Sequence, residues 1–119
     1  MGDASPPGGE EMIIEQVYIL ASQEQREKIA SALASVVGQT QVQPGCMSCR
    51  VFQNWQDLEE FLIEVKWDSM DGLISHLRSE TYTRLLLLIE LSACPPTLHF
   101  YTVHEARGLD MVQRARVSH

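Results

Sequence analysis

Three side chains in this 119-residue chain are of types that could take part in a reaction at the positions they occupy. Trp67 closes an extended run, His76 follows on a short helix, and Gln16 interrupts an otherwise apolar strand face. A half-buried histidine suits a base that works near neutral pH, and a tryptophan can stack on a flat aromatic substrate. A buried amide needs a hydrogen-bond partner, which is another side chain, a water or a substrate oxygen. Each of the three also has a plain structural explanation, as a packing or surface residue.

Tyr18 and Tyr82 are polar-tipped side chains that could line a pocket beside Trp67, and His99 is a further candidate. The sequence has no phosphate-binding glycine loop, no G-x-S-x-G, no H-E-x-x-H and no dinucleotide fingerprint. We therefore expect neither a flavin nor a nicotinamide cofactor, and no metal.

With only three cysteines, a four-thiolate zinc site is impossible. Cys46 and Cys49 form a C-x-x-C on an expected strand, where residues three apart point to opposite faces. We expect all three, including Cys94, to be packing residues in a reducing compartment.

Four apolar, β-branched and aromatic runs have the two-residue alternation of strands. They span residues 12–20, 46–53, 60–67 and 97–104.

Serines mark the expected helix starts. Ser22 and Gln25 form an S-x-x-Q capping box before a helix that we expect to end at Gly38. Ser69 and Ser79 are placed to cap a second and a third helix.

The order of elements, βαββααβ, predicts an α+β ferredoxin-like fold, in which helices cover one face of a four-stranded antiparallel sheet. We expect a disordered leader at 1–10, one domain at 11–106 and a polar tail at 107–119 that either frays or reaches a partner subunit.

The face of the sheet without helices is predicted to be apolar, because we place Ile13, Val17 and Ile19 on it. Exposing such residues to water is unfavourable, so we expect a homodimer that packs sheet against sheet.

The net charge of -7 argues against nucleic acid and anionic membranes as partners. No apolar run is long enough to cross a membrane, and the first residues lack the pattern of a signal peptide. We expect a cytoplasmic protein.

One set of residues in the central part of the chain forms a recognisable pattern: Pro44, Gly45, Phe61, Glu64, Trp67, Ser69, His76, Leu77 and Ser79. In this pattern the chain resembles the antibiotic biosynthesis monooxygenase family of dimeric α+β barrels. The likeness covers roughly residues 11–105.

This resemblance implies a cofactor-independent monooxygenase that oxidises a small phenol or hydroquinone with O₂. Trp67 would form the cavity wall, His76 would act as the base or its helper, and Gln16 would hydrogen-bond the developing oxyanion. Gln16 stands where relatives often have an asparagine. Glu64 should point away from Trp67, toward the subunit interface.

Two other functions are considered. A non-catalytic barrel that binds a small apolar molecule fits the short set of polar candidates. Haem-degrading relatives combine an asparagine, a tryptophan and a ligand histidine, at positions where this sequence has Gln16, His76 and Leu86. The missing ligand histidine argues against haem.

Overall fold

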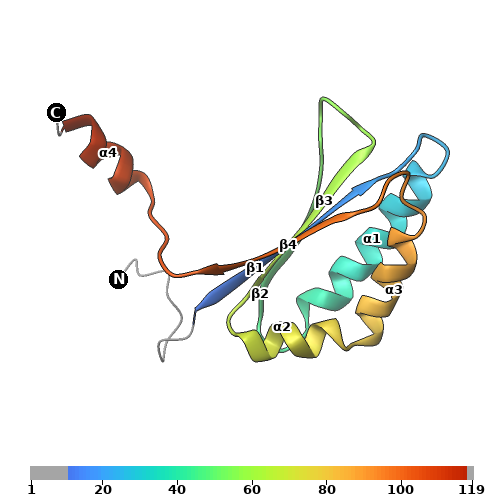
Figure 1. Ribbon diagram of the computed structural model, residues 1–119, viewed down its shortest axis with the longest axis horizontal. Helices are drawn as coiled ribbons and strands as arrows, with labels where there is room; N and C mark the ends of the chain where they lie inside the picture. Colours follow the sequence, from blue (N-terminus) through green and yellow to red (C-terminus); the bar gives the residue numbers. More distant parts are fainter. Residues whose placement is uncertain (1–10, 118–119) are drawn as a thin grey trace.

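The fold is an antiparallel sheet of four strands in the order β2-β3-β1-β4. The structure is a computed structural model, and it describes residues 11–117; the leader predicted at 1–10 lies outside this range. Three strands have the predicted bounds, and β4 ends one residue earlier than predicted (Figure 1). The strands are β1 (Met12–Leu20), β2 (Cys46–Gln53), β3 (Glu60–Trp67) and β4 (Thr97–Val103).

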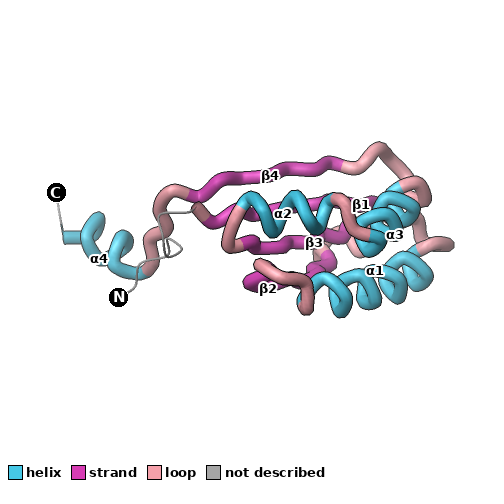
Figure 2. The backbone as a smooth tube through the Cα atoms, turned by 90° about the horizontal axis from the view of Figure 1, so that it is seen from below, coloured by secondary structure: helices cyan, strands magenta, loops and turns pink. Residues whose placement is uncertain are grey.

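Three helices lie on one face of this sheet: α1 (Arg26–Gln41), α2 (Met70–Leu77) and α3 (Glu80–Ile89). Figure 2 shows them together on one side, with β4 at the outer edge of the sheet. A fourth helix, α4 (Leu109–Val117), forms within the stretch predicted to be a polar tail and extends away from the sheet. The α+β fold with helices on one face is therefore confirmed.

Two of the three predicted helix starts are confirmed by their caps. The Ser69 hydroxyl accepts a hydrogen bond from the backbone N–H of Gly72 at 3.2 Å. The Ser79 hydroxyl accepts one from the backbone N–H of Tyr82, also at 3.2 Å. Each serine satisfies a backbone donor that has no partner within its helix.

The predicted bounds of α1 are wrong at both ends. The backbone N–H of Gln25 bonds to the carbonyl of Ser22, so this segment is a turn, and the helix begins at Arg26 without a side-chain cap. It continues past Gly38 to Gln41, and its buried residues include Val36 and Thr40. Packing on the sheet thus outweighs the weak helix propensity of a glycine.

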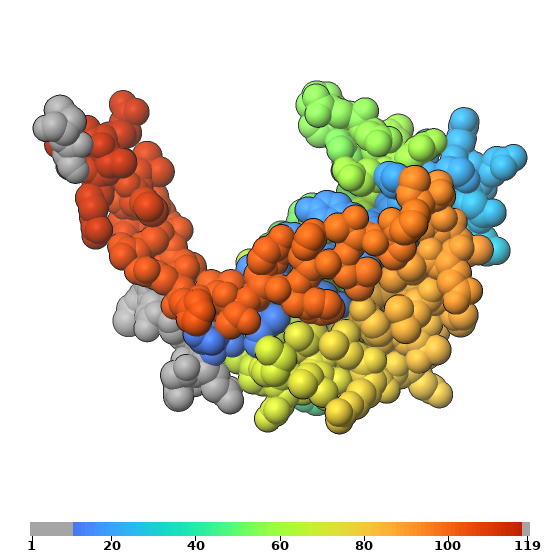
Figure 3. Space-filling model, in the orientation of Figure 1, coloured from blue at the N-terminus to red at the C-terminus, as the bar shows by residue number. Residues whose placement is uncertain are grey.

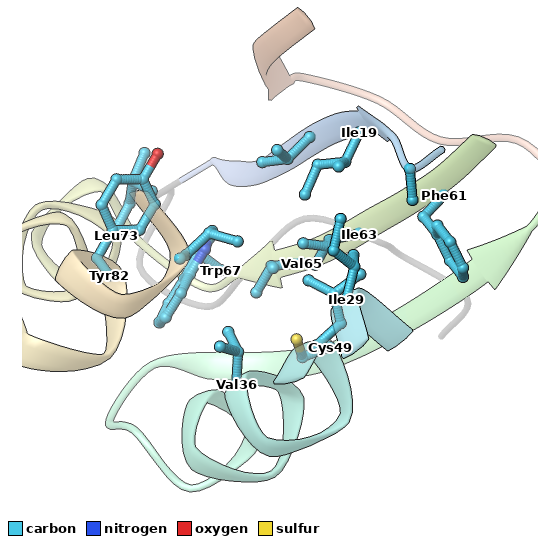
Figure 4. Packing of buried hydrophobic residues seen from close by; sticks show 14 of the residues in the cluster. Ile19, Ile29, Val36, Cys49, Phe61, Ile63, Val65, Trp67, Leu73 and Tyr82 are labelled. Atoms are coloured by element: carbon cyan, nitrogen blue, oxygen red, sulfur yellow. The ribbon is translucent and has the colours of Figure 1, made fainter. Parts of the chain in front are cut away.

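The prediction that Ile13, Val17 and Ile19 lie on the uncovered face is wrong. All three are buried under the helices, and their strand partners are Trp67, Ile63 and Phe61. Figure 4 shows Ile19 and Ile63 within the core that these strands build with α1, α2 and α3. Strand alternation defines two faces but does not say which one the helices cover.

The face without helices is mixed in character. Ile14, Tyr18 and Leu62 are half-buried on it, beside the polar pair Gln16 and Glu64. We call this surface the open face.

A β-bulge between Cys46 and Ser48 overturns the prediction that the two cysteines of the C-x-x-C face opposite ways. Cys46 now pairs with Trp67 and Cys49 with Val65, so both lie on the helix side. Burial raises the pKa of Cys46, and it raises the pKa of Cys49 to about 12. Both thiols are therefore protonated at neutral pH, which supports a packing role.

Candidate active site

Trp67, His76 and Tyr82 come together between the sheet and the helices. The ring centroids of Trp67 and His76 are 4.8 Å apart, and those of His76 and Tyr82 are 5.2 Å apart in an edge-to-face arrangement. Figure 4 shows the Trp67 ring directed from β3 toward the helices that carry Leu73 and Tyr82. The predicted neighbourhood of Trp67 with His76 and Tyr82 is present in the structure.

Glu15 stands at the centre of this group and was not among the predicted site residues. Its side chain is only 1 % exposed, on the helix side of β1. The indole N–H of Trp67 donates to Glu15 Oε1 at 3.1 Å, and His76 Nε2 lies 3.6 Å from the same oxygen. Within the described part of the chain, Glu15 Oε2 has no hydrogen-bond partner. An acidic residue between Ile13 and Val17 on an apolar face was the signal that could have revealed it.

Burial moves the two titratable groups in opposite directions. Desolvation raises the pKa of Glu15 from 4.5 to about 7, against a smaller lowering by the Trp67 hydrogen bond. Desolvation also lowers the pKa of His76 from 6.5 to about 4. At neutral pH the histidine is uncharged and the carboxyl group is poised between its two protonation states.

The tautomer of His76 follows from its other hydrogen bonds. The Ser79 hydroxyl donates to the backbone carbonyl of His76 at 2.7 Å, so it accepts from the amide nitrogen of Gln43 at 3.5 Å. Gln43 Oε1 therefore faces His76 Nδ1, at 2.7 Å. An amide oxygen only accepts, so Nδ1 carries the hydrogen and Nε2 presents a lone pair toward Glu15.

Across the described residues, no group of three or more His, Cys, Asp or Glu side chains is placed to hold a metal ion. None of the helices at 11–117 is both long and apolar enough to span a bilayer.

The family profile for antibiotic biosynthesis monooxygenases matches residues 12–86, which is more than half of the chain. The chain belongs to the antibiotic biosynthesis monooxygenase family. The matched stretch contains Glu15, Gln43, Trp67, His76 and Tyr82.

Solved structures show the same fold at low sequence identity. A candidate antibiotic biosynthesis monooxygenase from Deinococcus radiodurans is 22 % identical with a TM-score of 0.74, over 81 % of this chain and 96 % of that one. A conserved Bacteroides thetaiotaomicron protein of unknown function is 19 % identical with a TM-score of 0.73, over 79 % and 99 %. Rv0793 from Mycobacterium tuberculosis is 15 % identical with a TM-score of 0.73, over 82 % and 99 %. No curated protein sequence matches this chain.

Gln16 does not belong to the buried group of this family member. Its neighbour Glu15 takes the helix side, so Gln16 lies on the open face and cannot serve the site near Trp67 and His76. Its amide nitrogen donates to Glu64 Oε2 at 3.0 Å across the β1–β3 pair. Glu64 points away from Trp67, as expected.

Tyr18 and His99 also lie on the open face. Tyr18 pairs with Leu62, and His99 pairs with Gln16, so both follow the alternation that excludes them from the helix side. The prediction that Tyr18 lines a pocket with Trp67 is therefore wrong in position, whereas Tyr82 is placed beside the site.

The edge of the sheet next to Glu15 is open. Phe100 on β4 is the strand partner of Glu15, so both side chains lie on the helix side. Phe100 is nevertheless 46 % exposed, because the helices leave this edge uncovered (Figure 2).

Proposed function

We propose that this protein is a cofactor-independent monooxygenase that oxidises a small phenol- or hydroquinone-type substrate with O₂. Membership of the family supports this reaction class. The observation that carries the proposal is the buried pair of Glu15 and neutral His76, 3.6 Å apart beside Trp67 and Tyr82. A carboxylate whose pKa is raised by burial is a stronger base than one in water.

In the proposed reaction Glu15, as the carboxylate, accepts the proton of the substrate hydroxyl through Oε2. The substrate anion then passes an electron to O₂, and the two radicals combine to form a carbon–oxygen bond. Return of the proton from Glu15 converts the peroxide to a hydroperoxide. The O–O bond then breaks as the same carbon loses its own hydrogen as a proton, so that one oxygen atom stays on the product as a carbonyl and the other leaves as water. The apolar surroundings keep bulk water from the anion.

The remaining residues orient this base. The indole N–H of Trp67 holds Oε1, which leaves Oε2 for the substrate. Gln43 fixes the hydrogen of His76 on Nδ1, so the lone pair on Nε2 faces Glu15 and the histidine stays uncharged beside it. Trp67 thus orients the base, in addition to offering an aromatic surface, which differs from the cavity-wall role implied by the resemblance.

The test is oxygen uptake by the purified protein with a panel of phenols and hydroquinones, with ¹⁸O₂ to detect incorporation into the product. A Glu15→Gln variant should lose about 100-fold or more in rate, which is typical for removal of a positioned base. Glu27→Gln, an exposed position on α1, is the matched control and should keep its rate. Uptake that is absent throughout the panel, or equal in the two variants, would refute the proposal.

The competing proposal is a non-catalytic barrel that binds a small apolar molecule. A surface groove of about 360 Å³ between α1 and α3 favours it. The groove is lined mainly by small and apolar residues: Ala32, Ser35, Val36, Arg84, Leu87 and Leu88. The test is displacement of an apolar fluorescent probe by small apolar molecules. Binding that is weakened by Leu87→Asp but not by Glu15→Gln would support this proposal.

We further propose that the chain forms a homodimer through the open face. The half-buried Ile14, Tyr18 and Leu62 on this face favour burial against a second copy, and the polar pair of Gln16 and Glu64 fixes its register. Sedimentation that shows a single chain at micromolar concentration would refute this assembly.

A further inference from the structure

The C-terminal helix α4 lies outside the packed body of the protein. Every residue of α4 is exposed, including its four large apolar side chains. These are Leu109, Met111, Val112 and Val117. A helix of nine residues is marginal in water without packing, so this helix needs a surface to lie on.

Part of the apolar surface of α4 forms a continuous strip. Met111, Val112 and Ala115 are spaced as neighbours on a helix surface, and Arg116 flanks them. The helix therefore offers an apolar strip with a basic margin.

Figure 3 shows that α4 and the β2–β3 hairpin rise on the same side of the sheet, at its two ends, with β1 and β4 between them. The concave surface between these two walls is the open face. A second copy placed on this face would lie between the two walls.

The hairpin end complements α4 in both polarity and charge. Phe52, Trp55 and Leu58 are exposed there, beside a hollow of about 170 Å³ that Tyr18 and Leu62 help to line. The hairpin loop is acidic, with Asp57, Glu59 and Glu60 close together in the sequence. Apolar surface that is rimmed by charge is typical of a protein contact site.

Within one chain, α4 and the hairpin belong to opposite ends of the sheet. At one end of the sheet, β4 ends at Val103, which pairs with Met12 at the start of β1, and α4 follows. At the other end, Leu20 pairs with Glu60, and the hairpin loop lies beyond this pair. The hairpin and β4 also lie at opposite edges of the sheet. A two-fold axis in the plane of the open face and perpendicular to the line that joins α4 to the hairpin exchanges the positions of these two elements. Each α4 then meets the hairpin of the other copy.

We propose that α4 of one protomer docks on the β2–β3 hairpin of its partner, with Met111 and Val112 against Trp55 and Phe52, and Arg116 facing the acidic loop. This inference rests on the proposed homodimer but not on the proposed enzymatic activity.

The test is a disulfide between two differently sized full-length chains, both in a Cys94→Ser background because Cys94 is an exposed thiol. One chain carries Val112→Cys and the other carries Trp55→Cys. Under mild oxidation the mixed-size product should form in high yield. The control pairs Val112→Cys with Ala34→Cys, an exposed position on the outer side of α1, and should give little product.

Three outcomes are informative, because the mass of the unoxidised protein is measured in parallel. A dimer with the specific cross-link supports the docking. A dimer without it, or with equal yield in the control pair, overturns the docking but leaves the homodimer. A monomer overturns both.

A charge exchange gives an independent check on the full chain. Arg116→Glu should raise the dissociation constant of the dimer several-fold, and Glu59→Arg in the same chain should restore it. Met111→Asp together with Val112→Asp should raise the constant by about tenfold or more, since it places charge on the apolar strip. If all of these constants are unchanged, α4 does not contact the partner.

Discussion

The buried pair of Glu15 and His76 predicts an unusual dependence of stability on pH. Because the folded pKa of Glu15 is raised from 4.5 to about 7, the folded state binds this proton more tightly. Glu15 therefore contributes stability that is fully present below pH 4.5 and is lost as the pH rises to about 7. Each pKa unit is worth about 1.4 kcal/mol, so the loss is about 3 kcal/mol.

His76 acts in the reverse direction over almost the same range. Its folded pKa is lowered from 6.5 to about 4, so its contribution is present above pH 6.5 and is lost as the pH falls to about 4. This loss is again about 3 kcal/mol. Between pH 4.5 and 6.5 the two contributions oppose each other, because the folded and unfolded states both hold one proton on the pair.

The pair should therefore leave the free energy of unfolding nearly flat between these pH values, and single variants should reveal opposite slopes. In Glu15→Gln only His76 remains, and stability should fall by about 3 kcal/mol as the pH is lowered from 6.5 to 4. In His76→Gln only Glu15 remains, and stability should fall by a similar amount as the pH is raised from 4.5 to 7.

Urea unfolding at several pH values measures these slopes, and Glu27→Gln, on the exposed side of α1, is the control for removal of a carboxylate. The reasoning is refuted if the free energy of unfolding changes with pH in the same direction in both variants, or if both variants behave like the wild type. Burial would then not shift the pKa values of Glu15 and His76 in opposite directions.

Three further predictions concern the neighbourhood of the site. Gly45 has φ of 87°, and an added Cβ would lie 3.0 Å from Asp68 Oδ1, so Gly45→Ala should lower the free energy of unfolding by about 1–2 kcal/mol in a thermal melt. Gln43→Leu removes the acceptor for His76 Nδ1 and should cost about 1–3 kcal/mol, with a changed histidine tautomer signal in ¹⁵N NMR. Ser79→Ala should cost about 1 kcal/mol through the lost cap of α3, measured by urea unfolding.

The strands and two helix starts were predictable because each depends on a short stretch of sequence. Ser69 and Ser79 act on backbone groups three residues away, so the caps can be seen in the sequence alone. The end of α1 beyond Gly38 depends instead on burial against the sheet, which no local pattern contains.

The candidate site was predicted in part. Trp67 and His76 could be placed together because β3 ends at Trp67 and the helix that carries His76 follows directly. Glu15 was missed and Gln16 was misplaced for one common reason: the alternation along β1 was correct, but the helices cover the other face. The choice of face depends on the whole apolar content of both strands and on the helices above them, so it is a tertiary property.

The polar residues on the two faces of β1 also explain how the register between β1 and β3 is fixed. A slip of one residue would move Glu15 to the open face and carry Gln16 into the core. Glu15 would then lose Trp67, and Gln16 would lose Glu64, so both polar pairs would break at once. A buried amide without a partner costs about 1–3 kcal/mol by mutational measures. The two adjacent polar residues on β1 therefore specify one register from both faces, and the same register brings the base of the proposed site to Trp67 and His76.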